Sequence, residues 1–250
     1  MTELKQNERV DQTGFGSIGI IQDPGEFCYG VDSVLLSDFC AKLYRKPTET
    51  TFIIDLGTGS GIIPLVLSYK TPAGHILGID IQEKPIDRAR RSASMNGLEG
   101  RLEFEVADVK SFVEDRADLK GSFDIVTCNP PYFTSGVGIK PDNPARLISR
   151  HETTASLRDF IRCSAELLRD KGELFMVHRP SRLCDIFLEA RKYSLEPRTI
   201  RQVVPRRGDP ANIMLVHMIK NGGSDLTVLP ELAVHDNNGN YTEELQEAYK

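Results

Sequence analysis

The chain has 250 residues, of which 40% are hydrophobic and 27% are charged, and its formal net charge is −5. These values are typical of a globular protein long enough for one α/β domain, and no apolar run reaches the ~20 residues of a membrane span. Because the five cysteines include no C-x-x-C pair and the first residues lack a signal peptide's apolar region, we expect a cytoplasmic protein with neither disulfides nor membrane attachment.

Residues 1–50 are expected to lead into the main domain as a hairpin and a helix. An apolar run, Ile18 to Ile21, lies between glycines and an Asp-Pro-Gly turn, which predicts a small hairpin within 14–29. Apolar residues at helical spacing predict a helix over 31–44.

Residues 51–222 alternate between strand and helix patterns, which predicts a doubly wound, seven-stranded and mostly parallel α/β sheet. Strands are predicted at 51–56, 75–80, 102–107, 123–128, 172–177, 197–204 and 213–220, and helices at 61–70, 83–96, 110–116, 156–170 and 181–193. Residues 223–250 hold six acids against Lys250 alone, so they are expected to form an acidic C-terminal extension, with the whole chain still one compact domain.

A glycine-rich turn, Gly57-Thr58-Gly59-Ser60-Gly61, follows the first of these strands and precedes a helix. Glycines let a ligand approach the backbone, and the start of a helix presents free N–H groups. Ile62 stands where a dinucleotide fingerprint has its third glycine, and Asp55 would repel a pyrophosphate but suits a ligand that carries an ammonium. By itself the turn is equally compatible with an ordinary strand–helix connection.

The next two strands each end at an acid, Asp80 and Asp108. Asp80 could accept hydrogen bonds from both hydroxyls of a ribose, and Asp108 could accept one from an adenine amino group. Capping of the following helices is the alternative role for both acids. Because the carboxyl ends of parallel strands meet at one edge of a sheet, we expect these acids to share a crevice with the glycine turn.

Asn129-Pro130-Pro131-Tyr132 closes the fourth strand. Two prolines cannot continue a sheet, so this tetrapeptide is predicted to be a stiff loop at the strand's carboxyl end. It presents a side-chain amide, carbonyl oxygens and an aromatic face. These groups suit a planar amine or a carboxamide.

Together these motifs resemble class I S-adenosylmethionine-dependent methyltransferases of the Asn-Pro-Pro-Tyr group, which methylate planar amino nitrogens. Within that group the chain is most similar to the bacterial family that methylates the 6-amino group of the adenine just 3′ of the anticodon in tRNA(Val). The resemblance covers about residues 30–220 and includes the Tyr29 to Leu36 segment and Arg150-His151-Glu152. It extends to the tail at 232–249.

The resemblance implies a class I methyltransferase fold that ends in an antiparallel strand pair, S-adenosyl-L-methionine as cofactor and tRNA as partner. The implied catalytic residues are Asn129, Pro130, Pro131 and Tyr132. The implied cofactor-binding residues are Tyr29, Asp32, Asp55, Gly57, Thr58, Gly59, Gly61, Asp80, Ile81, Asp108, Val109 and Asn129. Asp32 could instead cap the helix that starts beside it.

Substrate contacts are expected from Tyr132, Phe133, Arg150, His151, Arg206 and Arg207. The long loop at 130–153 could be a mobile substrate flap or a segment without a role, and Arg150 and His151 could contact RNA or anchor this flap. Arg206-Arg207 could bind phosphate or be a solvated surface turn. The His151-Glu152 pair lacks the second histidine of a zincin, because residue 155 is alanine, and no metal is expected.

Three other functions remain open at this stage. A protein glutamine methyltransferase could use the same tetrapeptide to hold a carboxamide. An RNA-binding module with an inactive site would bind RNA without turnover, and an NAD oxidoreductase would use the glycine turn for a dinucleotide.

Overall fold

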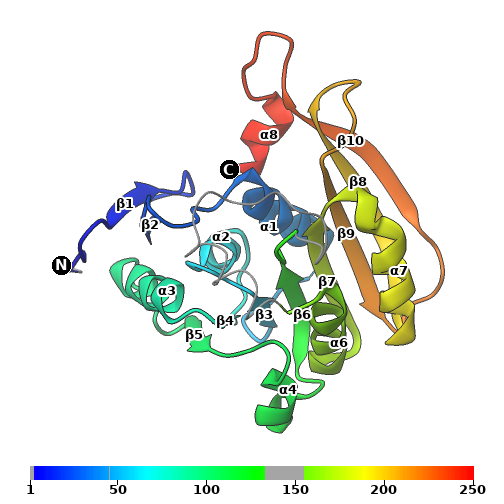
Figure 1. The fold of residues 1–250 in the computed structure, drawn as a ribbon, viewed down its shortest axis with the longest axis horizontal. Helices are drawn as coiled ribbons and strands as arrows, with labels where there is room; N and C mark the ends of the chain where they lie inside the picture. Colours follow the sequence, from blue (N-terminus) through cyan, green and yellow to red (C-terminus); the bar gives the residue numbers. More distant parts are fainter. Residues whose placement is uncertain (1–2, 45, 133–154) are drawn as a thin grey trace, which may run out of the picture.

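The computed structural model describes residues 3–44, 46–132 and 155–250 (Figure 1). In chain order the elements are β1 (Arg9–Gln12), β2 (Gly19–Gln22), α1 (Val31–Leu43), β3 (Phe52–Leu56), α2 (Ile62–Lys70), β4 (His75–Asp80), α3 (Glu83–Met95), β5 (Leu102–Val106), α4 (Phe112–Asp115), η1 (Ala117–Leu119), β6 (Phe123–Cys128), α6 (Leu157–Leu167), β7 (Leu168–His178), η2 (Pro180–Arg182), α7 (Leu183–Lys192), β8 (Leu195–Arg206), β9 (Ile213–Lys220), β10 (Thr227–His235) and α8 (Glu243–Ala248).

The main sheet has eight strands in the order β10-β8-β9-β7-β6-β3-β4-β5. β9 is antiparallel to both of its neighbours, and the other recorded pairings within this sheet are parallel. The doubly wound fold and the antiparallel β8–β9 pair are therefore confirmed. The carboxyl ends of β3, β4, β5, β6 and β7 meet at one edge of the sheet, and the β8–β9 turn lies at the same edge.

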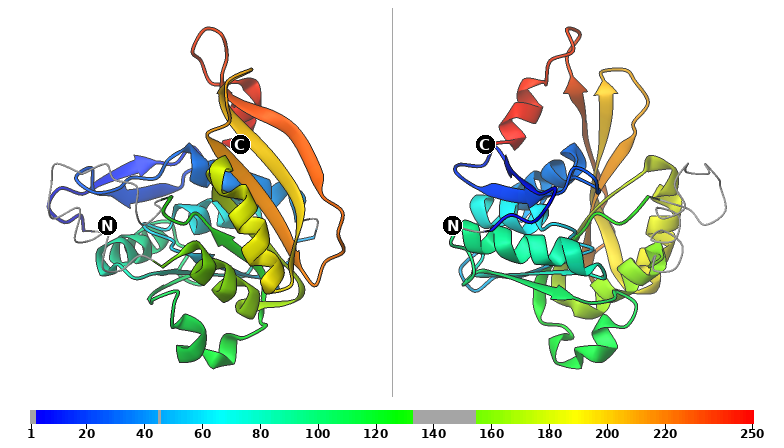
Figure 2. Two further views of the ribbon diagram at one scale, coloured as in Figure 1. Left: turned by 45° about the vertical axis from the view of Figure 1, so that its right-hand side comes forward. Right: turned by 60° about the vertical axis from the view of Figure 1, so that its left-hand side comes forward.

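Helices cover both faces of this sheet, with α1, α2 and α3 on one side and α4, α6 and α7 on the other (Figures 1 and 2). Successive strand residues point to opposite faces, so they contribute to two separate cores. In β3, for example, Ile53 belongs to the core under α1 and α2, whereas Ile54 and Leu56 belong to the core under α4 and α6. Burial on both faces explains why the parallel strands read as continuous apolar runs.

The N-terminal hairpin begins earlier than expected. Its strands are β1 and β2, joined from Arg9 to Gln22, rather than a hairpin contained in residues 14–29. The polar sequence of β1 hid it, because this strand is mostly exposed and carries no apolar alternation.

The acidic tail also contributes more than expected, because residues 227–235 form an eighth strand rather than part of an extension. β10 pairs in parallel with β8, and the register shifts between Leu229 and Leu232, around Pro230. β10 contains Pro230, which an edge strand tolerates. The tail then returns to the body through α8, where Leu245 and Ala248 are fully buried.

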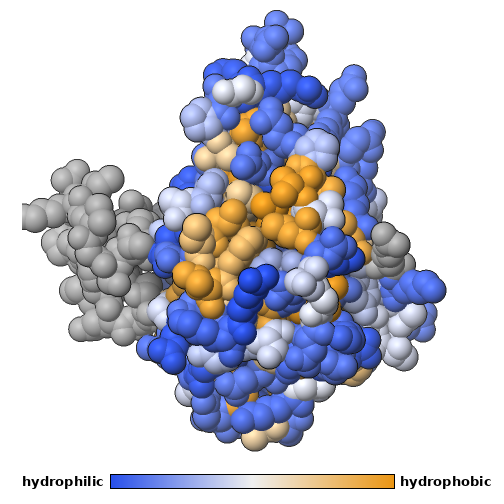
Figure 3. Space-filling view, turned by 90° about the vertical axis from the view of Figure 1, so that its right-hand side faces the viewer, coloured by the Kyte–Doolittle hydropathy of each residue, from blue (hydrophilic) through white to orange (hydrophobic). Residues whose placement is uncertain are grey.

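The outer side of β10 and the neighbouring α7 form an apolar face (Figure 3). Leu188, Leu226 and Val228 are its exposed large hydrophobic side chains. Among the residues that the structure describes, no helix is long and apolar enough to cross a membrane.

Candidate active site

The glycine turn connects β3 to α2, and Gly57, Gly59 and Gly61 all have positive φ, at 71°, 55° and 83°. The backbone N–H groups of Gly57 and Thr58 both donate to the Ile79 carbonyl at 2.9 Å, which ties the turn to β4. A Cβ on Gly61 would lie 2.9 Å from the Phe104 ring, so this glycine is needed for close packing. A Cβ on Gly59 would meet nothing within 4 Å, so open space lies over the middle of the turn.

Asp55 lies at the base of this turn and is fully buried. Its Oδ1 accepts a hydrogen bond from Thr127 Oγ1 at 2.7 Å, while its Oδ2 has no partner among the described residues. Burial raises the pKa of Asp55 to about 7, against the hydroxyls of Thr58 and Thr127, which lower it. The Thr58 hydroxyl does so by proximity, because it makes no hydrogen bond of ordinary geometry with the described residues. A buried carboxyl with one free oxygen suits a ligand that carries positive charge.

Asp80 ends β4, and two backbone N–H groups hold its carboxylate. Gly59 N donates to Oδ2 at 3.0 Å and Gln82 N donates to Oδ1 at 2.9 Å. Burial raises the pKa of Asp80, and these backbone hydrogen bonds oppose the shift. Each carboxylate oxygen can accept a further hydrogen bond, so two vicinal hydroxyls could still bind here. Asp80 therefore braces the turn and remains able to bind a ribose.

The other residues expected near an adenine differ in exposure. Ile81 is exposed beside Asp80, whereas Val109 is buried in the core under α4. Asp108 accepts a hydrogen bond from Lys110 N at 2.9 Å and lies 3.4 Å from Lys110 Nζ. Asp108 does not cap α4, whose N-cap is Ser111, and its side chain is partly exposed.

Asn129 follows β6, and its amide is oriented by two side chains from the start of α1. Asn129 Nδ2 donates to Asp32 Oδ2 and to Ser33 Oγ, both at 3.1 Å. Because both amide hydrogens are directed at α1, Oδ1 remains as the acceptor of this side chain. Asp32 also accepts from Ser33 N through its other oxygen, so it contacts both the helix start and the tetrapeptide.

Tyr132 closes this network. Its hydroxyl lies 2.8 Å from Asp32 Oδ2 and 2.9 Å from Asn129 Oδ1, and its single proton can be donated to only one of them at a time. Burial and the negative charge of Asp32 raise the pKa of Tyr132, so the phenol stays protonated. Within the tetrapeptide Pro130 is buried and Pro131 is exposed.

Two residues at the end of β7, unlike Asn129 and Tyr132, were not anticipated from the sequence. His178 packs edge-on against the Tyr132 ring at 5.4 Å, and the Arg179 guanidinium lies 5.0 Å over it. Burial, followed by the charges of Arg182 and Arg179, lowers the pKa of His178 to about 4, so this imidazole is neutral at physiological pH. The position of His178-Arg179-Pro180 at the end of a parallel strand was the signal that could have revealed them.

The remaining expected residues lie around this centre or outside the described part of the chain. Arg206 and Arg207 are exposed at the β8–β9 turn, and Arg179 Nη1 donates to the Asn212 carbonyl of this turn at 3.0 Å. Tyr29 is half-buried, and burial and the charge of Asp11 raise its pKa. Phe133, Arg150 and His151 lie outside the described residues, as does most of the loop at 130–153.

A family model described as a methyltransferase domain matches residues 47–192, which include the glycine turn, Asp80 and the tetrapeptide. The chain belongs to this methyltransferase domain family. Its cofactor is S-adenosyl-L-methionine, and the resemblance noted from the motifs is confirmed.

Curated relatives and solved structures agree with this assignment. The chain is 31% identical to the tRNA1(Val) (adenine(37)-N6)-methyltransferase of Porphyromonas gingivalis, over 71% of each chain. It is 25% identical to the protein of the same name from Aeromonas hydrophila, over 86% of this chain and 85% of the relative.

Two solved structures share the fold. A protein described as a predicted O-methyltransferase from Agrobacterium tumefaciens superposes with a TM-score of 0.70 and 21% identity, over 87% of this chain and 95% of the other. A geranyl diphosphate C-methyltransferase from Streptomyces coelicolor, in complex with S-adenosyl-L-homocysteine, superposes with a TM-score of 0.56 and 12% identity, over 74% of this chain and 77% of the other.

The residues present fit this cofactor. The open space over Gly59 admits a ligand to the backbone, and Asp55 at the base of the turn has a carboxyl oxygen without a partner among the described residues. Asp80 has acceptor capacity for a ribose. These three groups lie on neighbouring strands, so the crevice can hold the methionyl and ribosyl parts of one molecule.

Proposed function

We propose that this enzyme methylates the 6-amino group of an adenine in RNA, and that its substrate is tRNA(Val), at the adenine next to the anticodon. The observation that carries the proposal is the orientation of the Asn129 amide. Its two hydrogens are held by Asp32 and Ser33, so its oxygen is the group available to a substrate. An acceptor in that position selects a substrate that donates, as an exocyclic amine does.

The bound cofactor supplies a methyl group that its sulfonium already activates. We expect Asn129 Oδ1 and the Pro130 carbonyl each to accept one N–H of the amine, which directs the nitrogen lone pair at the methyl. Such positioning can supply several kcal/mol of the barrier. The amine becomes cationic on methylation and then loses its proton, so this step requires no strong general base.

Tyr132 is expected to stack on the target base, which must be unstacked or flipped to reach the site. One face of its ring lies under Arg179, so the base would stack on the other face or displace the guanidinium. The exposed Arg206 and Arg207 lie at the same edge of the sheet, where they could bind the RNA backbone. The names of the relatives support tRNA(Val) as the particular RNA.

The test is to incubate the purified enzyme with labelled S-adenosylmethionine and either tRNA that lacks the modification or a glutamine-containing protein acceptor. We expect label in tRNA, recovered as N6-methyladenosine by nucleoside mass spectrometry, and labelling that is slower by about 10²-fold or more with Asn129→Ala. Label in the protein acceptor alone would overturn the proposal.

A further inference from the structure

The N-terminal hairpin is attached to α3 by polar side chains at successive helical turns. Asn96 donates to the Gly19 carbonyl at 2.7 Å and accepts from Gly19 N at 3.0 Å, and Ser92 Oγ accepts from Ile21 N at 2.9 Å. One turn further toward the start of α3, Arg88 pairs with Glu26. Residues spaced by four lie on one face of a helix, so this stripe follows the chain from β2 into the segment beyond it.

We call residues 23–30, between β2 and α1, the strap. Glu26 near its start is held to α3, and Asp32 just beyond its end is hydrogen-bonded to Asn129 after β6. In the sheet β3 lies between β6 and β4, and α2 lies between α1 and α3 (Figure 1). The strap therefore runs between these two attachment points, and the glycine turn that joins β3 to α2 lies between the same elements.

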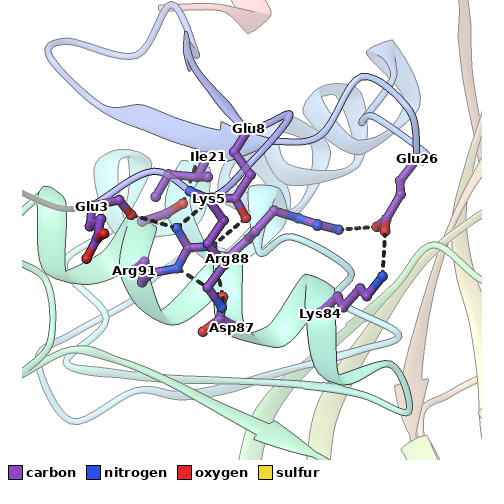
Figure 4. Close-up of polar contacts among 10 residues, drawn as sticks. Glu3, Lys5, Glu8, Ile21, Glu26, Lys84, Asp87, Arg88 and Arg91 are labelled. Atoms are coloured by element: carbon purple, nitrogen blue, oxygen red, sulfur yellow. Dashed lines mark hydrogen bonds and ion pairs between the residues drawn. The ribbon is translucent and has the colours of Figure 1, made fainter.

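Glu26 is attached to α3 mainly through one ion pair with Arg88, so the strap is either attached or free at this point. Figure 4 shows the Arg88 guanidinium directed at the Glu26 carboxylate. The Arg88 side chain is only 6% exposed, and the Glu26 side chain is 34% exposed. Arg88 Nε has no partner among the described residues, and Glu26 forms the ion pair of this buried guanidinium. The charge of Arg88 also contributes to the lowered pKa of Glu8, so Glu8 lies in the same electrostatic neighbourhood. Lys84 Nζ approaches Glu26 from the solvent side at 3.9 Å.

Apolar packing does not seal this contact. A pocket of about 280 Å³ lies beside it, and its lining includes Lys5, Glu8, Glu83 and Asp87. Phe27, next to Glu26, is 86% exposed and so adds little packing to the strap. A segment held by an ion pair over a polar pocket can open without exposing a core, unlike one held by buried apolar side chains.

We propose that Glu26 and Arg88 form a latch that holds the strap closed over the cofactor, and that release of this latch controls how fast the cofactor exchanges. The inference rests on the cofactor site that the proposed function uses, but it does not depend on the RNA substrate. Glu26 and Arg88 act as positioning residues, because they work through the strap and through Asp32.

The test measures the dissociation of S-adenosylhomocysteine from the full-length enzyme. The chain contains no tryptophan, so Phe27→Trp places a single fluorescent reporter on the strap. We expect its emission to change when S-adenosylhomocysteine saturates the enzyme. Leu188→Trp, on the distant apolar face of α7, should show no such change.

In the Phe27→Trp background, Glu26→Ala should raise the dissociation rate constant roughly tenfold, which corresponds to about 1.4 kcal/mol. Lys5→Ala is the control, because Lys5 pairs with Asp87 of the same helix at 2.8 Å but lies before the hairpin. This control should change the rate less than twofold. Hydrogen exchange in residues 23–30 should be faster in Glu26→Ala than in the parent enzyme. Glu26→Gln should show a dissociation rate constant between those two.

Three results would overturn the latch: an unchanged dissociation rate in Glu26→Ala, equal effects of Glu26→Ala and Lys5→Ala, or no response of the Phe27→Trp reporter to the ligand. Each of these can occur in an enzyme that still methylates RNA. Conversely, if the latch predictions hold but the enzyme transfers no methyl group to RNA, the proposed function is refuted and the latch is not.

Discussion

The two halves of the active-site edge differ in the chemical groups that form them. On the cofactor side, after β3 and β4, the groups are backbone N–H donors and two buried acids, of which Asp80 accepts backbone hydrogen bonds of 2.9 to 3.0 Å. On the substrate side, at the ends of β6 and β7, they are the side chains of Asn129, Tyr132, His178 and Arg179. Backbone groups are positioned by the fold itself, whereas side chains must be held by their neighbours. Substitutions on the two sides should therefore affect different kinetic constants.

The largest effect is expected on the substrate side. Asn129→Ala removes an oriented acceptor, and by analogy with the loss of one oriented group in other enzymes it should lower kcat by about 10²-fold or more. The Kd for S-adenosylhomocysteine should stay within about twofold of the wild type, as measured by calorimetry. A large loss of cofactor affinity would show that the two halves are not separable.

Next in size is the loss of a charge on the cofactor side. Asp80→Asn should raise the Kd for S-adenosylhomocysteine by roughly tenfold or more, because hydrogen bonds to a charged group contribute about 1.5–3 kcal/mol. At saturating cofactor, kcat should fall much less than it does in Asn129→Ala. Calorimetry and steady-state kinetics on one preparation would test this division, and an unchanged Kd would contradict it.

A smaller effect is expected at the periphery of the substrate side. The double substitution of Arg206 and Arg207 by alanine should raise the KM for RNA several-fold and reduce the slope of log Kd against log salt by roughly one to two units. Alanine at Arg191 and Lys192 removes the same charge at the far end of α7 and serves as the control. Equal effects of both pairs would indicate a general charge effect instead of a contact.

The smallest effect concerns Asp55 and pH. Its pKa in the folded protein is about 7, above the ~3.9 of an unfolded chain, so its stabilising contribution is complete below about pH 4 and is lost as the pH rises toward 7. A cationic ligand favours the carboxylate, so binding should release up to about one proton near pH 6.5, and affinity should rise with pH. Calorimetry in buffers of different ionisation enthalpy would detect the proton. Asp55→Asn should abolish it, and release that persists in this variant would assign it to another group.

The sequence predicted the cofactor side better than the substrate side. Gly57 to Gly61 and Asp80 are close in the chain and follow predicted strands, so their meeting follows from the parallel sheet. The hydrogen bonds from Asn129 to Asp32 and Ser33 join positions almost 100 residues apart, and strand patterns carry no information about them. The motif resemblance placed Asp32 near the cofactor, but it did not indicate that Asp32 orients the amide.

His178 and Arg179 were missed for a related reason. The sequence predicts their strand, but the site residues expected at the carboxyl ends of parallel strands follow the first four strands and none follows the fifth. Arg179 also acquires its position from the β8–β9 turn, through Asn212, which is a contact between elements that the sequence does not pair. β10 was not predicted, because the acids of residues 223–250 indicated an extension, whereas the structure places a strand there that includes Pro230 at the edge of the sheet.

Pro230 also affects whether this edge of the sheet can pair with another protein chain. β10 is the outermost strand on its side of the sheet, and Val228 lies on its exposed surface. An exposed edge strand that carries apolar side chains can pair with a strand of another chain and so promote aggregation. Because Pro230 has no backbone N–H to donate and the register of the β8–β10 pairing shifts beside it, the regular pairing pattern of this edge is interrupted near its middle. Pro230 thus opposes edge-to-edge association with another chain.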